Sequence, residues 1–156
     1  MPPRRRVDPD TGRAALAAWL ACVPAPAPDG VTPDGVTPDG VTPDGAAARQ
    51  PAADRPALPR QTLAAAVRWT LEELAARVPG HATEVRVPPF AAVQCLPGPG
   101  HTRGTPPNVV ETDPATWLAL VTGRTTWARA LASGTLRASG ERADLSGLLP
   151  LRHLGP

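Results

Sequence analysis

The sequence predicts an α+β domain, a small sheet covered on one face by helices, and three patterns carry this prediction. Residues 60–78 place apolar side chains at helical spacing. Residues 83–87 alternate apolar and polar side chains, as a half-buried strand does. Residues 109–151 then run through strand, helix, helix and strand patterns, each with its own start and stop residues. The chain of 156 residues is long enough for one ordinary domain.

Residues 1–23 are expected to form an amphipathic helix that docks on the domain. Asp8 is a suitable N-cap, and Pro9 suits the first helical position because its missing N–H is not needed there. The apolar face is formed by Leu16, Trp19, Leu20 and Val23. Three arginines and an apolar run also imitate a secretory signal, but acidic residues stand between them, so we favour the docking helix.

Residues 24–58 are predicted to be a disordered linker. The sequence P-D-G-V-T recurs there with a five-residue period that matches no known solenoid repeat. Each Pro-Asp-Gly is a turn signal, and each unit offers only one valine for burial. Burial on this scale does not offset the conformational entropy that ordering would cost.

A helix is predicted from about Arg60 to Val78, because its leucines and valines form one apolar stripe. Glu72 and Glu73 are expected on the solvent face of this helix. Trp69 lies off the stripe, so it either packs on the N-terminal helix or stays half exposed.

Four segments have strand patterns. Thr83–Val87 alternates cleanly, and Phe90–Leu96 continues as what we expect to be a more buried strand. The prolines at 88 and 89 interrupt the ladder, so these segments form either one bent strand or two strands joined by a tight corner. Asn108–Thr112 and Thr135–Ser139 are the other two strands.

Two helices are predicted between the last two strands. Asp113 and Pro114 begin the first, and Gly123 stands where a left-handed residue ends it. Thr125 or Thr126 begins the second. The apolar faces of the two helices are formed by Trp117, Leu118, Leu120, Val121, Trp127, Ala130 and Leu131.

Charge and hydropathy exclude several classes of protein. The formal net charge is +2, and all 16 basic residues are arginines that do not cluster, so a nucleic-acid partner is not expected. No segment approaches the ~20 apolar residues of a membrane span. A cytoplasmic protein is therefore expected.

No catalytic, metal-binding or cofactor-binding group stands out. Cys22 and Cys95 are far apart and are expected to act as small buried hydrophobic residues. The three histidines, at positions 81, 101 and 153, have no partner at metal-ligand spacing. None of the three serines lies in a G-x-S-x-G elbow. Glu111 and Asp113 are best explained as a strand end and a helix cap.

Several short motifs give the chain a family resemblance. They are Gly104–Asn108, Thr122-Gly123-Arg124, Ala130–Gly134 and Leu136–Gly140. In this order and spacing, the region from Leu63 to Leu154 resembles the C-terminal half of the sterol carrier protein domain family, in particular its short actinobacterial branch. The domain itself would then span residues 59–156.

The resemblance implies a non-enzymatic lipid-binding protein. It implies a twisted, mostly antiparallel sheet of about five strands, with helices on one face and a tunnel for a fatty acyl chain, a sterol or another lipid. The residues that would line this tunnel are Phe90, Val93, Trp117, Val121, Trp127 and Leu131. The alternative is that these side chains fill a closed core and that the domain is a protein-interaction or accessory module. The C-terminal segment is short and interrupted by proline, so the helix that closes the tunnel in larger members is expected to be truncated here.

Overall fold

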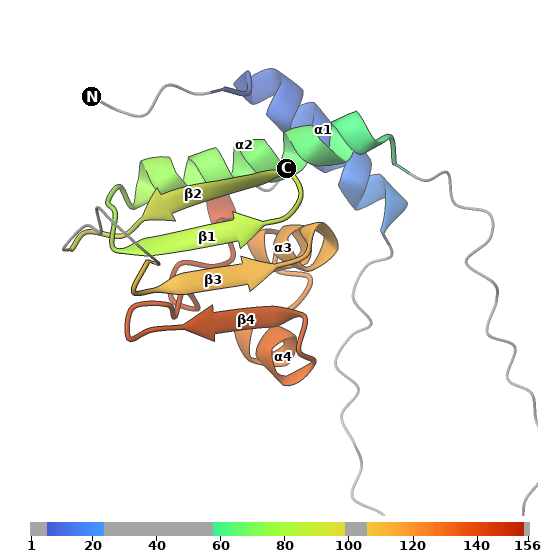
Figure 1. Cartoon of the computed structure of the whole chain (residues 1–156). Helices are drawn as coiled ribbons and strands as arrows, with labels where there is room; N and C mark the ends of the chain where they lie inside the picture. The colour runs from blue at the N-terminus through green and yellow to red at the C-terminus, as the bar shows by residue number, and fades with distance from the viewer. Residues whose placement is uncertain (1–5, 24–57, 99–105, 155–156) are drawn as a thin grey trace, which may run out of the picture.

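The structure is a computed structural model that describes residues 6–23, 58–98 and 106–154. The predicted linker, residues 24–58, lies outside the described residues apart from Leu58. The elements, shown in Figure 1, are α1 (Pro9–Cys22), α2 (Arg60–Arg77), β1 (Thr83–Val87), β2 (Ala91–Cys95), β3 (Val109–Thr112), α3 (Pro114–Val121), α4 (Trp127–Ala132), β4 (Leu136–Ser139) and a short 3-10 helix, η1 (Arg152–Leu154).

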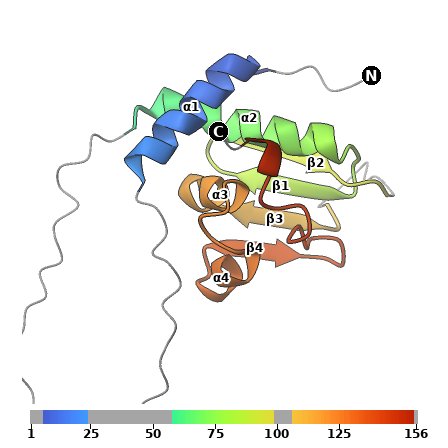
Figure 2. The ribbon, with the colours of Figure 1, turned by 180° about the vertical axis from the view of Figure 1, so that it is seen from behind.

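The described strands form one sheet in the order β2-β1-β3-β4. β1 pairs with β2 and β3 pairs with β4 in antiparallel fashion, and the central pair, β1 with β3, is parallel. Figures 1 and 2 show α2, α3, α4 and the C-terminal segment on one face of this sheet. The α+β class and the one-sided helical cover are therefore confirmed.

The described residues form four strands, so the expectation of about five was wrong. The four strand patterns in the sequence correspond to the four strands, and the fifth had come only from the family resemblance. After β4 the chain turns at Gly140, where φ is 102°. Leu145 and Leu151 then bury their side chains in the core cluster, so the segment follows the helical layer instead of adding a strand.

β2 is an edge strand, which corrects the expectation that it is the more buried of the first two. Its residues alternate between half-buried and exposed until the buried Cys95, whereas β1 buries Thr83, Val85 and Val87. β2 pairs only with β1 and so has one free edge. Of the two geometries left open by the prolines, the chain has two strands joined by a tight turn.

The predicted helix caps are present. The Asp8 side chain accepts a hydrogen bond from the N–H of Thr11 (3.1 Å), and Asp113 accepts one from the N–H of Thr116 (3.0 Å). Gly123 follows α3 with φ 75°, a left-handed conformation that glycine adopts without a steric penalty. These local signals set the helix ends because each satisfies backbone groups that the helix leaves unpaired.

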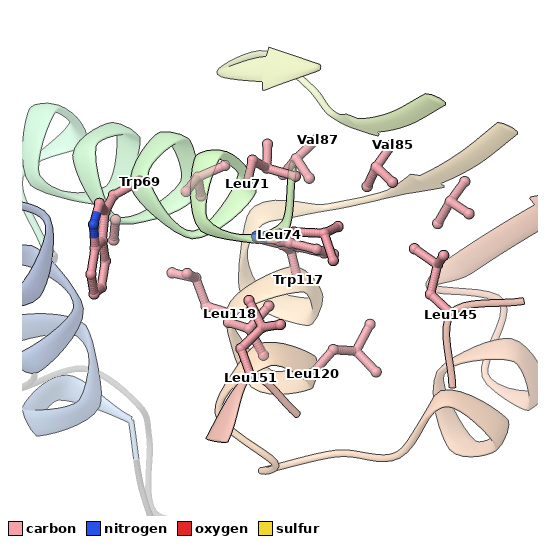
Figure 3. Close-up of a cluster of buried hydrophobic side chains, with 14 of the residues drawn as sticks. Trp69, Leu71, Leu74, Val85, Val87, Trp117, Leu118, Leu120, Leu145 and Leu151 are labelled. Carbon is pink, nitrogen blue, oxygen red and sulfur yellow. The ribbon is translucent and has the colours of Figure 1, made fainter. Parts of the chain in front are cut away.

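The core lies between α2, α3 and the inner face of the sheet (Figure 3). Trp117 on α3 is 0% exposed, and its Nε1–H donates to Thr70 Oγ1 on α2 (2.9 Å). The Thr70 hydroxyl in turn lies 2.8 Å from the Ala66 carbonyl oxygen, to which it can donate. The polar atoms of two buried side chains thus satisfy each other at the centre of an apolar cluster.

α1 packs across the other side of α2. Trp69 is 2% exposed and is directed toward α1 (Figure 3), so the first of the two environments expected for it is the correct one. α1 passes Trp69 at Gly12, where an added β-carbon would overlap the Cβ, Cγ and Cδ2 atoms of Trp69. Glycine is needed here because the two helices approach too closely for any side chain.

The hydrogen bond between Trp117 and Thr70 gives a first prediction. Thr70→Val should lower the free energy of unfolding by about 1–3 kcal/mol, because the buried indole N–H loses its acceptor while the volume hardly changes. Urea unfolding measures the loss. Thr122→Val is the matched control, since the Thr122 hydroxyl donates only to carbonyl groups of its own helix. Equal costs for the two variants would contradict a special role for this hydrogen bond.

Cys95 gives a second prediction. Burial raises the pKa of its thiol from 9.0 to about 11. Between these values the unfolded chain loses a proton that the folded chain keeps, so the free energy of unfolding should fall as pH rises from 9 to 11, by roughly 2–3 kcal/mol in total. Below pH 9 the thiol is protonated in both the folded and the unfolded chain, so its titration does not lower the free energy of unfolding there. The chain has no Lys or Tyr, so few other groups titrate in this range.

Urea unfolding at several pH values in a Cys22→Ser background measures this slope, and Cys95→Ala should flatten it. A slope that is unchanged in Cys95→Ala would assign the pH dependence to another group.

Candidate functional site

The flank formed by α4 is where large apolar side chains of the helical layer reach solvent. α4 has six residues and buries only Ala130. Trp127 is half-buried against the core cluster, and Leu131 is 41% exposed. Among the described residues, no other large apolar side chain is as exposed as Leu131. α4 lies beside β4 at one edge of the sheet (Figures 1 and 2).

Short-range hydrogen bonds hold α4 in its helical form. Thr126 accepts a hydrogen bond from the N–H of Arg129 (3.2 Å), as expected for an N-cap. The Ser133 hydroxyl donates to the Ala130 carbonyl (3.1 Å), and Gly134 ends the helix with φ 73°. α4 is therefore well capped, but its single buried residue gives it little anchorage to the rest of the fold.

The six residues predicted to line a tunnel fall into three groups. Trp117 and Val121, 0% and 1% exposed, are part of the closed core cluster beneath the middle of the sheet. Trp127 and Leu131 lie on α4 beside β4. The remaining two, Phe90 and Val93, lie at the β2 edge.

The strand order places β1 and β3 between the two edges that carry these residues. The row Val93, Val85, Val110 and Ala138 runs from β2 to β4 through the paired positions of the sheet. The predicted residues are thus spread along the helical layer from one edge to the other, with the two buried ones between.

A depression of about 400 Å³ lies at the end of β3 and the start of β4. It is lined by Pro88, Glu111, Thr112, Asp113, Gly134, Thr135 and Arg137. Asp113 is engaged as the cap of α3, and the Thr112 hydroxyl donates to the Thr135 carbonyl (2.8 Å). Its polar lining does not suit an apolar ligand, because an acyl chain would remove these groups from water without replacing their hydrogen bonds.

Other kinds of site find little support in the described part of the chain. Residues 6–23, 58–98 and 106–154 contain no group of three or more His, Cys, Asp or Glu side chains placed to hold a metal ion. In these same ranges, no helix is long and apolar enough to cross a membrane. The Cys95 thiol is buried, and its raised pKa keeps it protonated at neutral pH.

Two polar residues have roles that the sequence did not reveal. Glu72 is half-buried and accepts hydrogen bonds from the N–H groups of Arg6 and Val7 (3.0–3.3 Å), so its expected place on the solvent face was wrong. Arg124, which entered the sequence analysis only as part of a motif, donates to the carbonyl groups of Leu20 and Val23 at the end of α1. These contacts span 65 to 104 residues, a separation at which sequence periodicity carries no signal.

The chain matches one known protein family over most of the described fold. Residues 59–151 match the family described as "Bacterial SCP ortholog", SCP being the abbreviation of sterol carrier protein. A search of curated proteins gives no significant match. The matched region begins at α2 and includes the whole sheet, α3, α4 and the buried C-terminal segment. On this match, which spans well over half of the chain, the protein belongs to the bacterial sterol carrier protein orthologue family.

Proposed function

We propose that this protein is a non-enzymatic cytoplasmic carrier that binds an apolar ligand, a fatty acyl chain or a sterol-like molecule, between the sheet and the helices. The family match carries the proposal, because it covers the complete helical layer and sheet. Residues 59–156 would be the binding unit, α1 would dock on it as an accessory helix, and residues 24–58 would be a disordered linker. The absence of an evident catalytic constellation in the sequence agrees with a carrier.

In this proposal, the α4 flank is the place where a ligand first contacts the helical layer. Leu131 is already 41% exposed and Trp127 is half-buried, so a ligand can contact both before any core residue moves. Ala130 and Leu136 lie beneath them and are buried. An outward movement of α4 would extend this contact toward the core cluster, at the cost of the burial of Ala130 and of the half-buried Trp127.

A closed-core interaction or accessory module is the second candidate, and one observation favours it. Trp117 is completely buried and its N–H is already satisfied by Thr70, as is usual for a tryptophan that serves as core. In that case the exposed face of α4 would meet another protein instead of a lipid.

Titration with a brominated long-chain fatty acid tests the carrier directly, because bromine quenches only tryptophans that it approaches closely. We expect saturable quenching that is largely lost in Trp127→Phe and retained in Trp19→Phe, since Trp19 lies on α1. Leu131→Asp should weaken binding about tenfold by placing a charge in the apolar contact. It should change the free energy of unfolding by less than about 0.5 kcal/mol, because Leu131 is exposed.

Ala132→Asp is the matched control, since it places the same charge on the neighbouring exposed residue of α4. It should leave binding unchanged. If no fatty acid or sterol quenches any tryptophan and Trp127→Ala only destabilises the fold, the carrier proposal is wrong and the closed-core module remains.

A further inference from the structure

Both ends of α1 are held by charged side chains from the family-matched region. At the N-terminal end, the Glu72 carboxylate on α2 accepts hydrogen bonds from the N–H groups of Arg6 and Val7. At the C-terminal end, the Arg124 guanidinium donates to the carbonyl oxygens of Val23 (2.9 Å) and Leu20 (3.3 Å). Each charge suits the groups that it meets: the anion accepts from backbone N–H groups just before α1, and the cation meets the carbonyl end of the helix.

The middle of α1 is fixed by shape. Gly12 lies against the ring of Trp69, where no β-carbon fits. Ala15, Leu16 and Trp19 continue the buried face along the helix. Arg124 also lies over the Trp19 ring, with its Cζ atom 5.8 Å from the ring centroid, so one guanidinium contacts both the backbone and a side chain of α1.

Arg124 belongs to the turn that connects α3 to α4. Its own N–H and that of Thr125 donate to the Ala119 carbonyl (2.8 and 3.2 Å), which ties the turn to α3. Trp127, the first residue of α4, follows three positions later. Because α4 is anchored to the core only through Ala130 and the half-buried Trp127, its position depends on the turn that precedes it.

We propose that α1 is a latch on α4 and that Arg124 is the positioning residue through which it acts. While α1 is docked, its C-terminal carbonyls hold Arg124, and the α3–α4 turn keeps α4 against the edge of the sheet. Release of α1 removes these contacts and lets α4 move outward, which uncovers apolar side chains of the helical layer. The consequence for a lipid rests on the proposed function, whereas the coupling between the two helices does not.

The latch has a physical reason to be reversible. α1 lies outside the matched region, and 34 residues, 24–57, separate it from the described residue Leu58. Local opening of a peripheral helix costs less free energy than global unfolding, so α1 can be released while the sheet stays intact. Trp69 Nε1 has no hydrogen-bond partner in the docked arrangement, a cost that release relieves.

Amide hydrogen exchange of the full-length protein, followed by NMR, tests the coupling without any ligand. The reporter is the amide of Ala130, which is 2% exposed and donates to the Thr126 carbonyl (3.0 Å). Gly12→Val should displace α1 by overlap with Trp69 and speed exchange at Ala130 by about tenfold more than in β1 and β3. Ala17→Val is the matched control, because it adds the same side chain at an exposed position of α1.

A double-mutant cycle shows whether the coupling passes through Arg124. Arg124→Gln should also speed exchange at Ala130, and Arg124→Lys should restore part of the protection because it keeps the charge. In the Arg124→Gln background, Gly12→Val should add less than about twofold. Fully multiplicative effects of the two substitutions would overturn the role of Arg124.

The wild-type protein supplies a test that does not depend on any variant. If α1 is the latch, the amides in the middle of α1 must exchange at least as fast as that of Ala130. Faster exchange at Ala130 than in α1 would mean that α4 opens while α1 is docked, and the latch would be wrong.

A ligand measurement then separates the latch from the carrier proposal. Gly12→Val should raise the association rate of a long-chain fatty acid several-fold, because more molecules are in the open state. If exchange at Ala130 depends on α1 but no fatty acid binds, the latch is supported and the carrier is contradicted. If a fatty acid binds but exchange at Ala130 does not depend on α1, the carrier is supported and the latch is contradicted.

Discussion

The hydrogen bond between Trp117 and Thr70 is the contact on which the arrangement of the helical layer depends. It joins α2 to α3 at a point that is closed to water, so the indole N–H depends on the Thr70 hydroxyl, which itself donates to a carbonyl of α2. An indole ring at this position also fills the space beneath the central strands, where Val85, Val87 and Val110 are completely buried. Removing either partner therefore affects two helices and the sheet together.

α2 is buried on two of its faces. Thr70, Leu71 and Leu74 belong to the face toward the sheet, and Trp69 packs against α1. The hydrogen-bonding of the two tryptophans differs accordingly. Trp117 has a partner in the central core, while Trp69, at the seam between α1 and α2, has none. The central core is thus the better satisfied of the two contacts in its hydrogen bonds.

The sequence predicted those features that local chemistry decides. Asp8, Asp113 and Gly123 marked the helix ends correctly because caps and left-handed turns need only neighbouring residues. The alternation in Thr83–Val87 identified the inner face of β1 for the same reason. The edge position of β2 was not predictable, because it depends on which strands pair. The partners of Glu72 and Arg124 lie on a helix far away in the sequence, so their roles emerge only when α1 is placed on the fold.

The candidate site was predictable to a similar degree. Trp127 and Leu131 were identified as apolar residues of a short helix, and they do lie on α4. The sequence could not tell that Leu131 would face solvent while Val121 would be buried, since both lie in helices with mainly apolar residues. Exposure is decided by what covers each helix, and here that depends on the C-terminal segment. The Leu151 N–H donates to the Val121 carbonyl (3.0 Å). The C-terminal segment therefore covers α3, but it leaves the outer side of α4 exposed.

The parallel pairing of β1 with β3 has a consequence for how this domain folds. β1 and β2 form a hairpin from adjacent residues, and β3 and β4 are joined through α3 and α4. Only the β1–β2 hairpin pairs positions that are close in the sequence, at most 12 residues apart. The β1–β3 pairs are 25 residues apart and the β3–β4 pairs 24 to 30, so both pairings close larger loops and are the slower events. The rate of folding should accordingly be set by the addition of β3 and β4 to the hairpin and not by the formation of any single helix.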